Sequence, residues 1–373
     1  MRRKVMFVIN SLTGGGAERV MATLMHGSAA LAERHDIVLV LLDRDEDAYA
    51  LPGWLRTIRL DCRHSLARSL TQLWRTVAVE RPDVAVGFLT RANVVTAAVM
   101  AARRRPFLLS ERVNTSAHLG AGRAAAASRL LVRATYRHAT EILAVSEGVA
   151  DTLVSDFGVS RTRVTAIPNP IDTDIIEARA AEPSAVPVTG PYIAAMGRLV
   201  PNKNFALAIE AFAVSGIAGR LVIMGQGPEE AALRALGQRL GLGDRLVLPG
   251  FVANPHAVIA RADAVVLSSN AEGFPNALVE SLAAGTPVVA TDCPSGPAEV
   301  LDVRIGADGG PVAGRGGYLV PMNAVTPMAE ALRAVVEPAR RAALIEAGRA
   351  RVRDYSVARG VERYWARIEA ALR

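Results

Sequence analysis

Short apolar segments alternate with longer amphipathic segments along this chain, and that alternation restricts the folds open to it. Apolar runs such as KVMFVIN (4–10) and DIVLVLLD (36–43) are separated by stretches with helical spacing of apolar residues, such as AERVMATLMHGSAALAER (17–34). Strands of about five to seven residues joined by helices are typical of a parallel sheet covered by helices on both faces. The sequence therefore predicts an α/β fold.

The alternation restarts after a proline-rich segment at 166–191. YIAAMGRL (192–199), RLVIMGQG (220–227) and TPVVATD (286–292) read as strands of a second unit with helices between them. Prolines clustered between two strand patterns mark a boundary. We predict two Rossmann-like domains, at 1–170 and 171–354, and a C-terminal helix at 355–373 that packs on the first domain.

Composition supports a globular protein and narrows its partners. Hydrophobic residues make up 51% of the chain and charged residues 21%, which excludes disorder as the main state. The net charge is +8 over residues 1–170 and −1 over the rest. This one-sided excess suits an anionic partner, either nucleic acid or a membrane surface, although an arginine-rich genome would also produce it.

Two further features bear on location. Cys62 and Cys293 lie far apart in no metal-ligand spacing, which favours a reducing compartment such as the cytoplasm. The start MRRKVMFVINSLTGGG imitates a signal peptide, but its apolar run is short and interrupted by Asn10, so we interpret it as the first buried strand. We also predict no transmembrane helix, because ANVVTAAVMAA ends at Arg103.

Two glutamates with seven residues between them flank a corner in EGFPNALVE (272–280). Pro275 suits the first position of a helix and Gly285 its end, which places Glu272 before the helix and Glu280 in its second turn. Amides at a helix start attract anions, so this corner can hold a diphosphate while the carboxylates accept hydrogen bonds from sugar hydroxyls. A simple cap at Glu272 and a half-solvated Glu280 are the structural alternative.

The loop after the first strand of the second unit carries two cations in GRLVPNKNF (197–205). Arg198 and Lys203 stand where open α/β sheets bind ligands, and both suit phosphate. Lys203 is one of two lysines among 43 basic residues, which hints that arginine would not serve there.

A glycine-rich turn, SLTGGGAERV (11–20), follows the first strand and opens the first helix. Its glycines let the backbone approach a phosphate or sugar. The dinucleotide fingerprint G-x-G-x-x-G fits at Gly14 and Gly16 but has Arg19 in its third position, and GQGPEE (225–230) breaks it too. The turn is therefore weak support for a dehydrogenase.

Taken together, these segments resemble the retaining glycosyltransferases of family four. GGGAE, PNPID, GRLVPNKN, GQGPE, LPGF and EGFPNALVESLAAGTPVVATDCPSGPAEVL occur in this order, and the resemblance covers the whole chain. It implies the GT-B fold, in which two Rossmann-like domains face an interdomain cleft. It also implies transfer of a hexose or N-acetylhexosamine from a nucleotide diphosphate sugar, expected to be UDP-linked.

The resemblance assigns roles to the residues already described. It implies that Arg198 and Lys203 hold the donor diphosphate, that Glu272 takes the hydroxyls of the transferred sugar, and that Glu280 takes the ribose. Arg198, Lys203 and Glu272 are the implied catalytic residues, in a front-face mechanism in which the leaving diphosphate helps to remove the acceptor proton. The other implied donor-binding residues are Gly15, Gly16, Gly225, Gly273, Phe274, Asn276, Ala277 and Leu278.

The acceptor is expected on the first domain. The segments EGFPNALVE, DCPSGPAEV and LLSERVN are most similar to those of bacterial members that extend polyprenyl-diphosphate-linked or cell-surface glycans. This similarity implies a peripheral protein on the inner face of the plasma membrane. Many relatives place a histidine near the scissile bond. The corresponding loop here, SERVNTSAH (110–118), offers Glu111, Arg112 and His118 as acceptor-side candidates.

A basic helix and two acidic motifs complete the candidates. Residues 118–139 place Arg129, Arg133 and Arg137 on one helix face, which can lie among lipid headgroups or be a solvated face. DRD (43–45) and DTD (172–174) imitate the Asp-x-Asp metal motif. We interpret them as a loop and a helix start, and we expect no metal and no cofactor, because basic side chains and helix amides supply the positive charge.

Three other functions compete with glycosyl transfer. A non-catalytic subunit that binds a sugar nucleotide would not need Arg198, Lys203, Glu272 and Glu280 together. An NAD-dependent oxidoreductase would need the third glycine of the dinucleotide fingerprint, which this sequence lacks. Nucleic-acid binding has only the charge in its favour, since aromatic residues make up 5% and no recognition motif is present.

Overall fold

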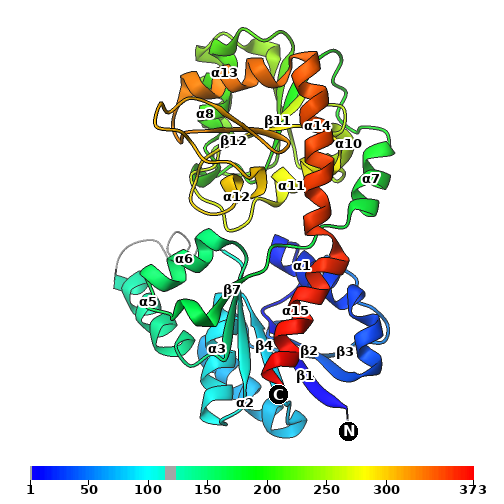
Figure 1. The fold of residues 1–373 in the computed structure, drawn as a ribbon, viewed down its shortest axis with the longest axis vertical. Coiled ribbons are helices and arrows are strands. Elements are labelled where there is room, and N and C mark those ends of the chain that lie inside the picture. The colour runs from blue at the N-terminus through cyan, green and yellow to red at the C-terminus, as the bar shows by residue number, and fades with distance from the viewer. Residues whose placement is uncertain (1, 114–122) are drawn as a thin grey trace. The chain divides into compact units, whose positions relative to one another are not determined.

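The structure, a computed structural model, describes residues 2–113 and 123–373. Contacts divide the chain into two units (Figure 1). Unit 1 comprises Met1–Pro170 and Val357–Arg373, and unit 2 comprises Ile171–Ser356. The last helix of the chain is therefore part of the N-terminal unit.

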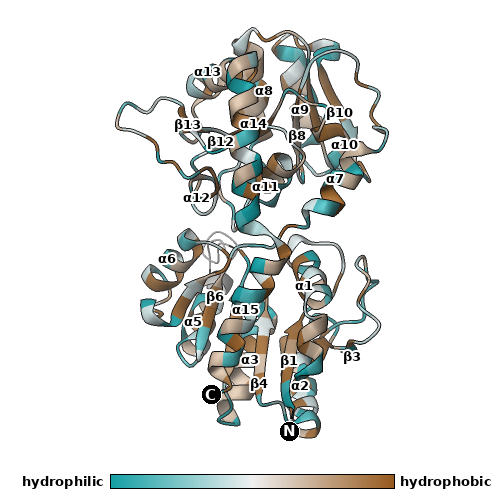
Figure 2. Cartoon of the chain, turned by 45° about the vertical axis from the view of Figure 1, so that its right-hand side comes forward, coloured by the Kyte–Doolittle hydropathy of each residue, from teal (hydrophilic) through white to brown (hydrophobic). Residues whose placement is uncertain are grey.

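Unit 1 contains a seven-stranded parallel sheet with strand order β3-β2-β1-β4-β5-β6-β7. The inner strands are almost wholly buried and apolar, as a sheet covered on both faces requires, and β1 and β4 carry the hydrophobic colour in Figure 2. The strands are β1 (Arg3–Ile9), β2 (His35–Leu41), β3 (Arg56–Arg59), β4 (Val84–Phe88), β5 (Phe107–Glu111), β6 (Glu141–Ala144) and β7 (Val164–Ala166).

Helices connect these strands, and side-chain caps begin two of them. Ser65 accepts a hydrogen bond from the amide of Arg68, and Ser146 accepts one from the amide of Val149, so each satisfies an amide in the first turn. The helices are α1 (Gly16–Gly27), α2 (Leu66–Glu80), α3 (Thr90–Ala102), α5 (Arg123–Tyr136), α6 (Glu147–Ser155) and α15 (Val357–Ala371), with 3₁₀ turns at Ala29–Glu33 and Arg161–Arg163.

Helix α15 completes the core of unit 1. The Trp365 indole N–H donates to the Ser28 hydroxyl at 2.8 Å, and the Tyr364 ring stacks on Phe88 with centroids 5.8 Å apart. Val361 and Ile368 are buried in the same cluster. The amphipathic C-terminal segment thus contributes its apolar face to a sheet made by the beginning of the chain.

Unit 2 contains a second seven-stranded sheet with order β10-β9-β8-β11-β12-β14-β13. All pairs are parallel except the last, because β13 runs antiparallel to β14. The strands are β8 (Tyr192–Met196), β9 (Arg220–Met224), β10 (Leu246–Gly250), β11 (Ala264–Leu267), β12 (Val288–Thr291), β13 (Val312–Gly314) and β14 (Gly317–Val320).

The helices of unit 2 pack around this sheet. Gly216 ends α8 in the left-handed conformation, which glycine adopts without strain. The helices are α7 (Thr173–Ala181), α8 (Phe205–Ser215), α9 (Glu230–Arg239), α10 (Pro255–Ile259), α11 (Asn276–Ala283), α12 (Pro297–Leu301), α13 (Val325–Val335) and α14 (Pro338–Val352), with 3₁₀ turns at Pro201–Lys203, Gly243–Arg245 and Arg353–Tyr355.

The predicted fold class is confirmed, since each unit is a Rossmann-like α/β layer structure. The sequence patterns did not predict β3, β7, β13 and β14, which are three or four residues long. Strand order reverses between β1 and β4 in unit 1 and between β8 and β11 in unit 2, and ligands of such sheets bind at the carboxyl ends of these strands. No helix in the two described ranges is both long enough and apolar enough to cross a bilayer.

Candidate active site

Two loops meet at the carboxyl edge of the unit 2 sheet, one following β8 and the other following β11. The Lys203 ammonium donates to Glu272 Oε1 at 2.6 Å, and the Ser269 hydroxyl donates to the same oxygen at 2.6 Å. The side chains of Lys203 and Glu272 are 26% and 11% exposed to solvent. One carboxylate oxygen is therefore held by two donors in a partly desolvated position.

Backbone contacts fix these loops against each other. The Asn270 amide donates to the Asn202 carbonyl at 2.8 Å, and the Asn202 side chain donates to the Ala271 carbonyl at 2.9 Å. The Ser268 hydroxyl donates to the carbonyl of Lys203 at 2.9 Å. These hydrogen bonds hold the two loops that carry Lys203 and Glu272 in place, which limits how far the loop backbone would have to rearrange around a ligand.

Arg198 lies in the same β8 loop and is exposed. Its side chain makes no hydrogen bond or ion pair with any residue in the described ranges. The loop backbone is nevertheless ordered by the Leu199 amide, which donates to the Gln226 carbonyl at 2.9 Å. Arg198 is consequently an exposed cation on a bonded loop, and its side chain is unpaired among the described residues.

The glycines that follow β9 lie where two loop backbones approach closely, as Gly225 shows. Its φ is +142°, and a Cβ added there would lie 1.9 Å from the Gly197 carbonyl oxygen. A Cβ on Gly227 would lie 2.2 Å from the carbonyl oxygen of Leu199. The β9 loop therefore packs backbone against backbone on the β8 loop, and only glycine fits.

The predicted helix after the corner is α11, with Pro275 at the N-cap rather than in the first helical position. Phe274 and Leu278 are buried, and the Phe274 ring packs on Tyr355 with centroids 5.5 Å apart. These two side chains therefore belong to the core of unit 2, and any contact with a ligand comes from their backbone.

Some amides at this corner are already bonded within the turn. The Asn276 amide donates to the Phe274 carbonyl, and the Leu278 amide donates to the Pro275 carbonyl, both at 2.9 Å. Gly273 and Ala277 are half-buried at the same turn. The amide run expected to line a phosphate is thus partly engaged in closing the helix start.

Glu280 is buried and faces His256, at the start of α10. The His256 Nε2 and Glu280 Oε2 atoms lie 3.2 Å apart, and the two residues are 4% and 3% exposed. His256 Nδ1 is buried without a partner among the described residues. The half-solvated Glu280 of the structural alternative is therefore wrong.

The glycine turn of unit 1 lies where it was expected, between β1 and α1. Gly15 is the N-cap residue of α1 and Gly16 is its exposed first residue. The Gly15 carbonyl accepts from the Arg19 amide at 3.1 Å and from the Tyr49 hydroxyl at 3.3 Å. This turn presents exposed backbone at the carboxyl end of β1.

Glu111, an acceptor-side candidate, lies inside unit 1 with 0% exposure. Its carboxyl group accepts from the Tyr136 hydroxyl at 2.6 Å and from the Thr90 hydroxyl at 3.4 Å. Burial raises the pKa of Glu111 to about 6, although these hydrogen bonds oppose the shift. The position favours a structural role over direct contact with an acceptor.

Arg112 is also buried, at 6% exposure. It donates to the Tyr364 hydroxyl and lies against the rings of Phe88 and Tyr364. Burial lowers the pKa of Arg112, although its neighbours Tyr364 and Glu111 oppose the shift. The third acceptor-side candidate, His118, lies outside the described residues.

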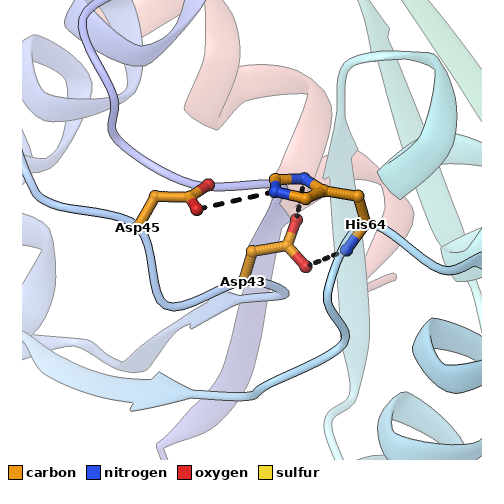
Figure 3. Close-up of side chains that lie close together, drawn as sticks. All are labelled: Asp43, Asp45 and His64. Carbon is orange, nitrogen blue, oxygen red and sulfur yellow. Dashed lines mark hydrogen bonds and ion pairs between the residues drawn. The ribbon is translucent and has the colours of Figure 1, made fainter.

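The acidic motif at 43–45 lies in a loop, as expected, and gathers with His64 (Figure 3). Ligand atoms of Asp43, Asp45 and His64 lie within 4.8 Å of one another, a spacing that could hold a metal ion. Asp43, however, is ion-paired with Arg91. Burial opposes ionisation of Asp43, but bonds from Arg91 and the His64 amide lower its pKa overall. The guanidinium therefore supplies the charge that a cation would bring.

Two other expectations concern helices. Asp172 of the DTD motif caps α7 by accepting from the Ile175 amide at 3.1 Å, which confirms the helix start. Arg129 and Arg133 lie on α5 and are exposed, but α5 ends at Tyr136. Arg137 is therefore outside the helix, and the predicted three-arginine face is wrong at that position.

Comparison with known proteins identifies the family. The sequence model described as "Glycosyltransferase Family 4" matches residues 14–175, and the one described as "Glycosyl transferases group 1" matches residues 177–351. The N-acetylgalactosamine-N,N'-diacetylbacillosaminyl-diphospho-undecaprenol 4-alpha-N-acetylgalactosaminyltransferase of Campylobacter jejuni is 31% identical over 314 residues, which is 80% of this chain and 83% of that one. The chain belongs to glycosyltransferase family 4.

Other relatives of this glycosyltransferase agree with that assignment. The lipopolysaccharide core biosynthesis glycosyltransferase LpsE of Rhizobium meliloti is 29% identical over 290 residues, 74% of this chain and 76% of that one. The solved structure of Anabaena HepE in complex with UDP has a TM-score of 0.76 and 19% identity, and the match covers 98% of this chain and 100% of HepE. This likeness supports the GT-B fold.

Two residues of this glycosyltransferase's candidate site were not singled out from sequence. Ser269 holds Glu272, and its only signal is its place two residues after the end of β11. His256 holds Glu280 from a different helix, 24 residues away, and no pattern in the sequence links the two. The His256–Glu280 contact depends on how the helices are arranged, whereas Ser269 and Glu272 are three residues apart in one loop.

Proposed function

We propose that this glycosyltransferase moves a hexose or N-acetylhexosamine from a UDP-linked donor, with retention of configuration, to a polyprenyl-diphosphate-linked or other cell-surface glycan. The observation that carries the proposal is the likeness to the Campylobacter jejuni transferase, whose name specifies a diphospho-undecaprenol acceptor and an N-acetylgalactosaminyl group. Such a substrate would bring the enzyme to the inner face of the plasma membrane as a peripheral protein.

Donor binding follows from the charges at the carboxyl edge of unit 2. Arg198 is exposed and unpaired within the described ranges, and Lys203 is bonded to Glu272. A diphosphate carries negative charge that both cations can neutralise. Its arrival would draw Lys203 toward phosphate and leave Glu272 free to accept hydrogen bonds from the hydroxyls of the transferred sugar.

The chemical step requires no protein nucleophile. The acceptor oxygen bonds to the anomeric carbon on the face from which the diphosphate departs, and the acceptor proton passes to a departing phosphate oxygen. Lys203 and Arg198 stabilise the charge that develops there. Glu272 is not needed as a nucleophile, because with the donor in place it accepts hydrogen bonds from Ser269 and from the hydroxyls of the transferred sugar.

We also propose that turnover needs no metal ion. Two cations close to the expected diphosphate supply the stabilisation that a divalent ion would otherwise give. In unit 1, the Asp43 group that could hold an ion is already paired with Arg91. Turnover that is unchanged in excess EDTA after dialysis would support this, and rescue by Mg²⁺ or Mn²⁺ would contradict it.

The function is tested with UDP-linked glucose, galactose and their N-acetylated forms against undecaprenyl-diphosphate glycans. We expect transfer from one of these donors, and nuclear magnetic resonance of the product should show the anomeric configuration of the donor. A thermal-shift comparison of UDP, GDP and ADP identifies the base, since a ligand at 100 times its Kd adds about 2.7 kcal/mol of stability. UDP binding without transfer would instead favour a non-catalytic subunit.

A further inference from the structure

One face of unit 1 collects arginines that have no acidic partner. It is formed by the outer side of α2 and the turn that follows α3, and we name it the α2–α3 face. None of its arginines forms an ion pair with a residue in the described ranges. The arginines of this face are Arg68, Arg75, Arg81, Arg103, Arg104 and Arg105.

The acidic residue of α2 does not offset this charge. Glu80 is buried, and its carboxylate is bonded to Lys4 at 3.1 Å and to Arg56. The hydrogen bonds from Arg56 and Lys4 lower the pKa of Glu80, against burial, so it stays ionised and committed to that pair of cations. Glu80 therefore does not compensate the positive charge of the α2–α3 face.

Apolar side chains are exposed beside these arginines. Trp74 keeps 45% of its exposure and Val79 keeps 79%. The Arg103 guanidinium lies 4.2 Å from the Trp74 ring centroid, and its Nε is buried without a partner among the described residues. The face therefore combines a tryptophan, an aliphatic side chain and basic groups, which is the composition of interfacial segments.

Two hollows lie on this face, one lined in part by Trp74 and the other in part by Arg103, and these two side chains contact each other. The first, of about 330 Å³, is mainly apolar and is lined by Leu70, Thr71, Trp74, Arg75, Ala98 and Val99. The second, of about 490 Å³, is mainly polar and is lined by Val77, Ala78, Arg81, Pro82, Arg103 and Arg105. An apolar hollow beside an arginine-lined one matches an acyl chain beside a phosphate headgroup.

We infer that the α2–α3 face docks on a bilayer surface that contains anionic phospholipids. Arginine donors suit phosphate, and each basic group near such a surface adds attraction that salt screens. A second copy of this chain is disfavoured, because a two-fold interface would bring the same unpaired arginines together. Duplex nucleic acid would use the charge but would leave Trp74 and Val79 without an apolar partner.

The inference deepens the proposed function, since it names the surface that would meet the membrane carrying the acceptor. Its test nevertheless needs no donor, acceptor or turnover. Vesicle binding by a protein that shows no transfer would support the docking surface and refute the proposed function. Transfer without vesicle binding would support the proposed function and refute the docking surface.

The first experiment follows tryptophan fluorescence of the full chain. Vesicles of phosphatidylglycerol and phosphatidylcholine should shift the emission to shorter wavelength, and brominated lipid should quench it. Trp74→Phe should abolish both changes. Trp54→Phe is the matched control, because Trp54 lies in the same unit with 39% exposure, and it should leave both changes in place.

The second experiment measures partitioning by co-sedimentation at low and physiological salt. Arg75→Gln with Arg81→Gln should weaken binding by about fivefold for each arginine removed. Arg239→Gln with Arg304→Gln, two exposed arginines of unit 2, is the matched control and should bind like the wild type. Thermal melts of all variants confirm that they are folded.

Several outcomes would overturn the inference. These are equal binding to pure phosphatidylcholine vesicles, and wild-type binding by the Arg75–Arg81 variant while Arg129→Gln with Arg133→Gln on α5 loses it. A dimer in light scattering that Trp74→Phe converts to a monomer would assign the face to a second copy. Tighter binding to duplex DNA than to anionic vesicles, with the same arginine dependence, would assign it to nucleic acid.

Discussion

Replacing Lys203 by methionine separates structure from catalysis in the candidate site. Lys203→Met keeps the length of the side chain and removes the ammonium that donates to Glu272 Oε1 at 2.6 Å. Ser269 still donates to that oxygen, so Glu272 loses one of its donors rather than both. The variant therefore weakens the site without emptying it.

The size of the effect on stability follows from exposure. Hydrogen bonds to charged groups contribute about 1.5–3 kcal/mol. The Lys203 side chain is 26% exposed, so solvent competes for its hydrogen bond and we expect a loss around or just below the lower limit of that range, about 1–2 kcal/mol. Replacing both partners, as in Lys203→Met with Glu272→Gln, should return most of this loss, because no unpaired charge is left.

Turnover should respond differently. If Lys203 stabilises charge on the leaving diphosphate, its loss should lower kcat by about 10²–10³-fold. The double variant should recover stability and remain inactive. Urea denaturation measures the first quantity, and initial rates with a saturating UDP-sugar donor measure the second.

Lys4→Met is the matched control, since Lys4 is the other lysine of the chain and its ammonium is bonded to Glu80 at 3.1 Å in unit 1. It should lose stability and keep its kcat. Wild-type kcat in Lys203→Met, or recovered turnover in the double variant, would refute the reasoning, because turnover would then not need the Lys203 ammonium.

Three further predictions follow from buried groups and a close approach. The pKa of Glu111 is raised from 4.5 to about 6 in the folded protein, so its contribution to stability is present below pH 4.5 and is lost as pH rises through 6. Urea denaturation at pH 4.5 and pH 7 should therefore show that the stability of Glu111→Gln minus that of the wild type increases by about 2 kcal/mol between these two pH values. Gly225→Ala should lower the melting temperature and UDP affinity far more than Gly243→Ala, because its Cβ would lie 1.9 Å from a carbonyl oxygen whereas Gly243 faces open space. His256→Ala should weaken UDP binding by about tenfold in calorimetry, because the buried carboxylate expected to take the ribose loses a contact that orients it. His256→Gln should restore most of the affinity by donating to Glu280 again, and equal affinities would refute the link.

The fold could be predicted because its main determinants are local. Apolar runs such as those of β1 and β2 are buried on both faces, and few arrangements other than a helix-covered parallel sheet satisfy them. The strands that escaped prediction are short; β3, at Arg56–Arg59, has no fully buried residue. Such a strand exists because the neighbouring strand offers it hydrogen bonds, and its own sequence carries no signal.

The candidate site could be predicted only in part. The cations and carboxylates were recognised by residue type and by their place after strands. The partners of Glu111 and Glu280 were not, because Tyr136 and His256 come from separate helices. A carboxyl group's burial and hydrogen bonds depend on which elements pack over it, so its chemical state is a property of the fold.

By itself, the sequence determined the class of fold, the family and the residue types available at the strand ends, since each of these is written in local patterns of apolar, glycine and charged residues. Tertiary structure decided which of those residues meet. Lys203 and Glu272 are 69 residues apart and touch because β8 and β11 are neighbours in the sheet, whereas Arg198, five positions from Lys203, remains unpaired in the described chain. Strand order, unlike strand identity, is set by long-range packing that no short stretch of sequence contains.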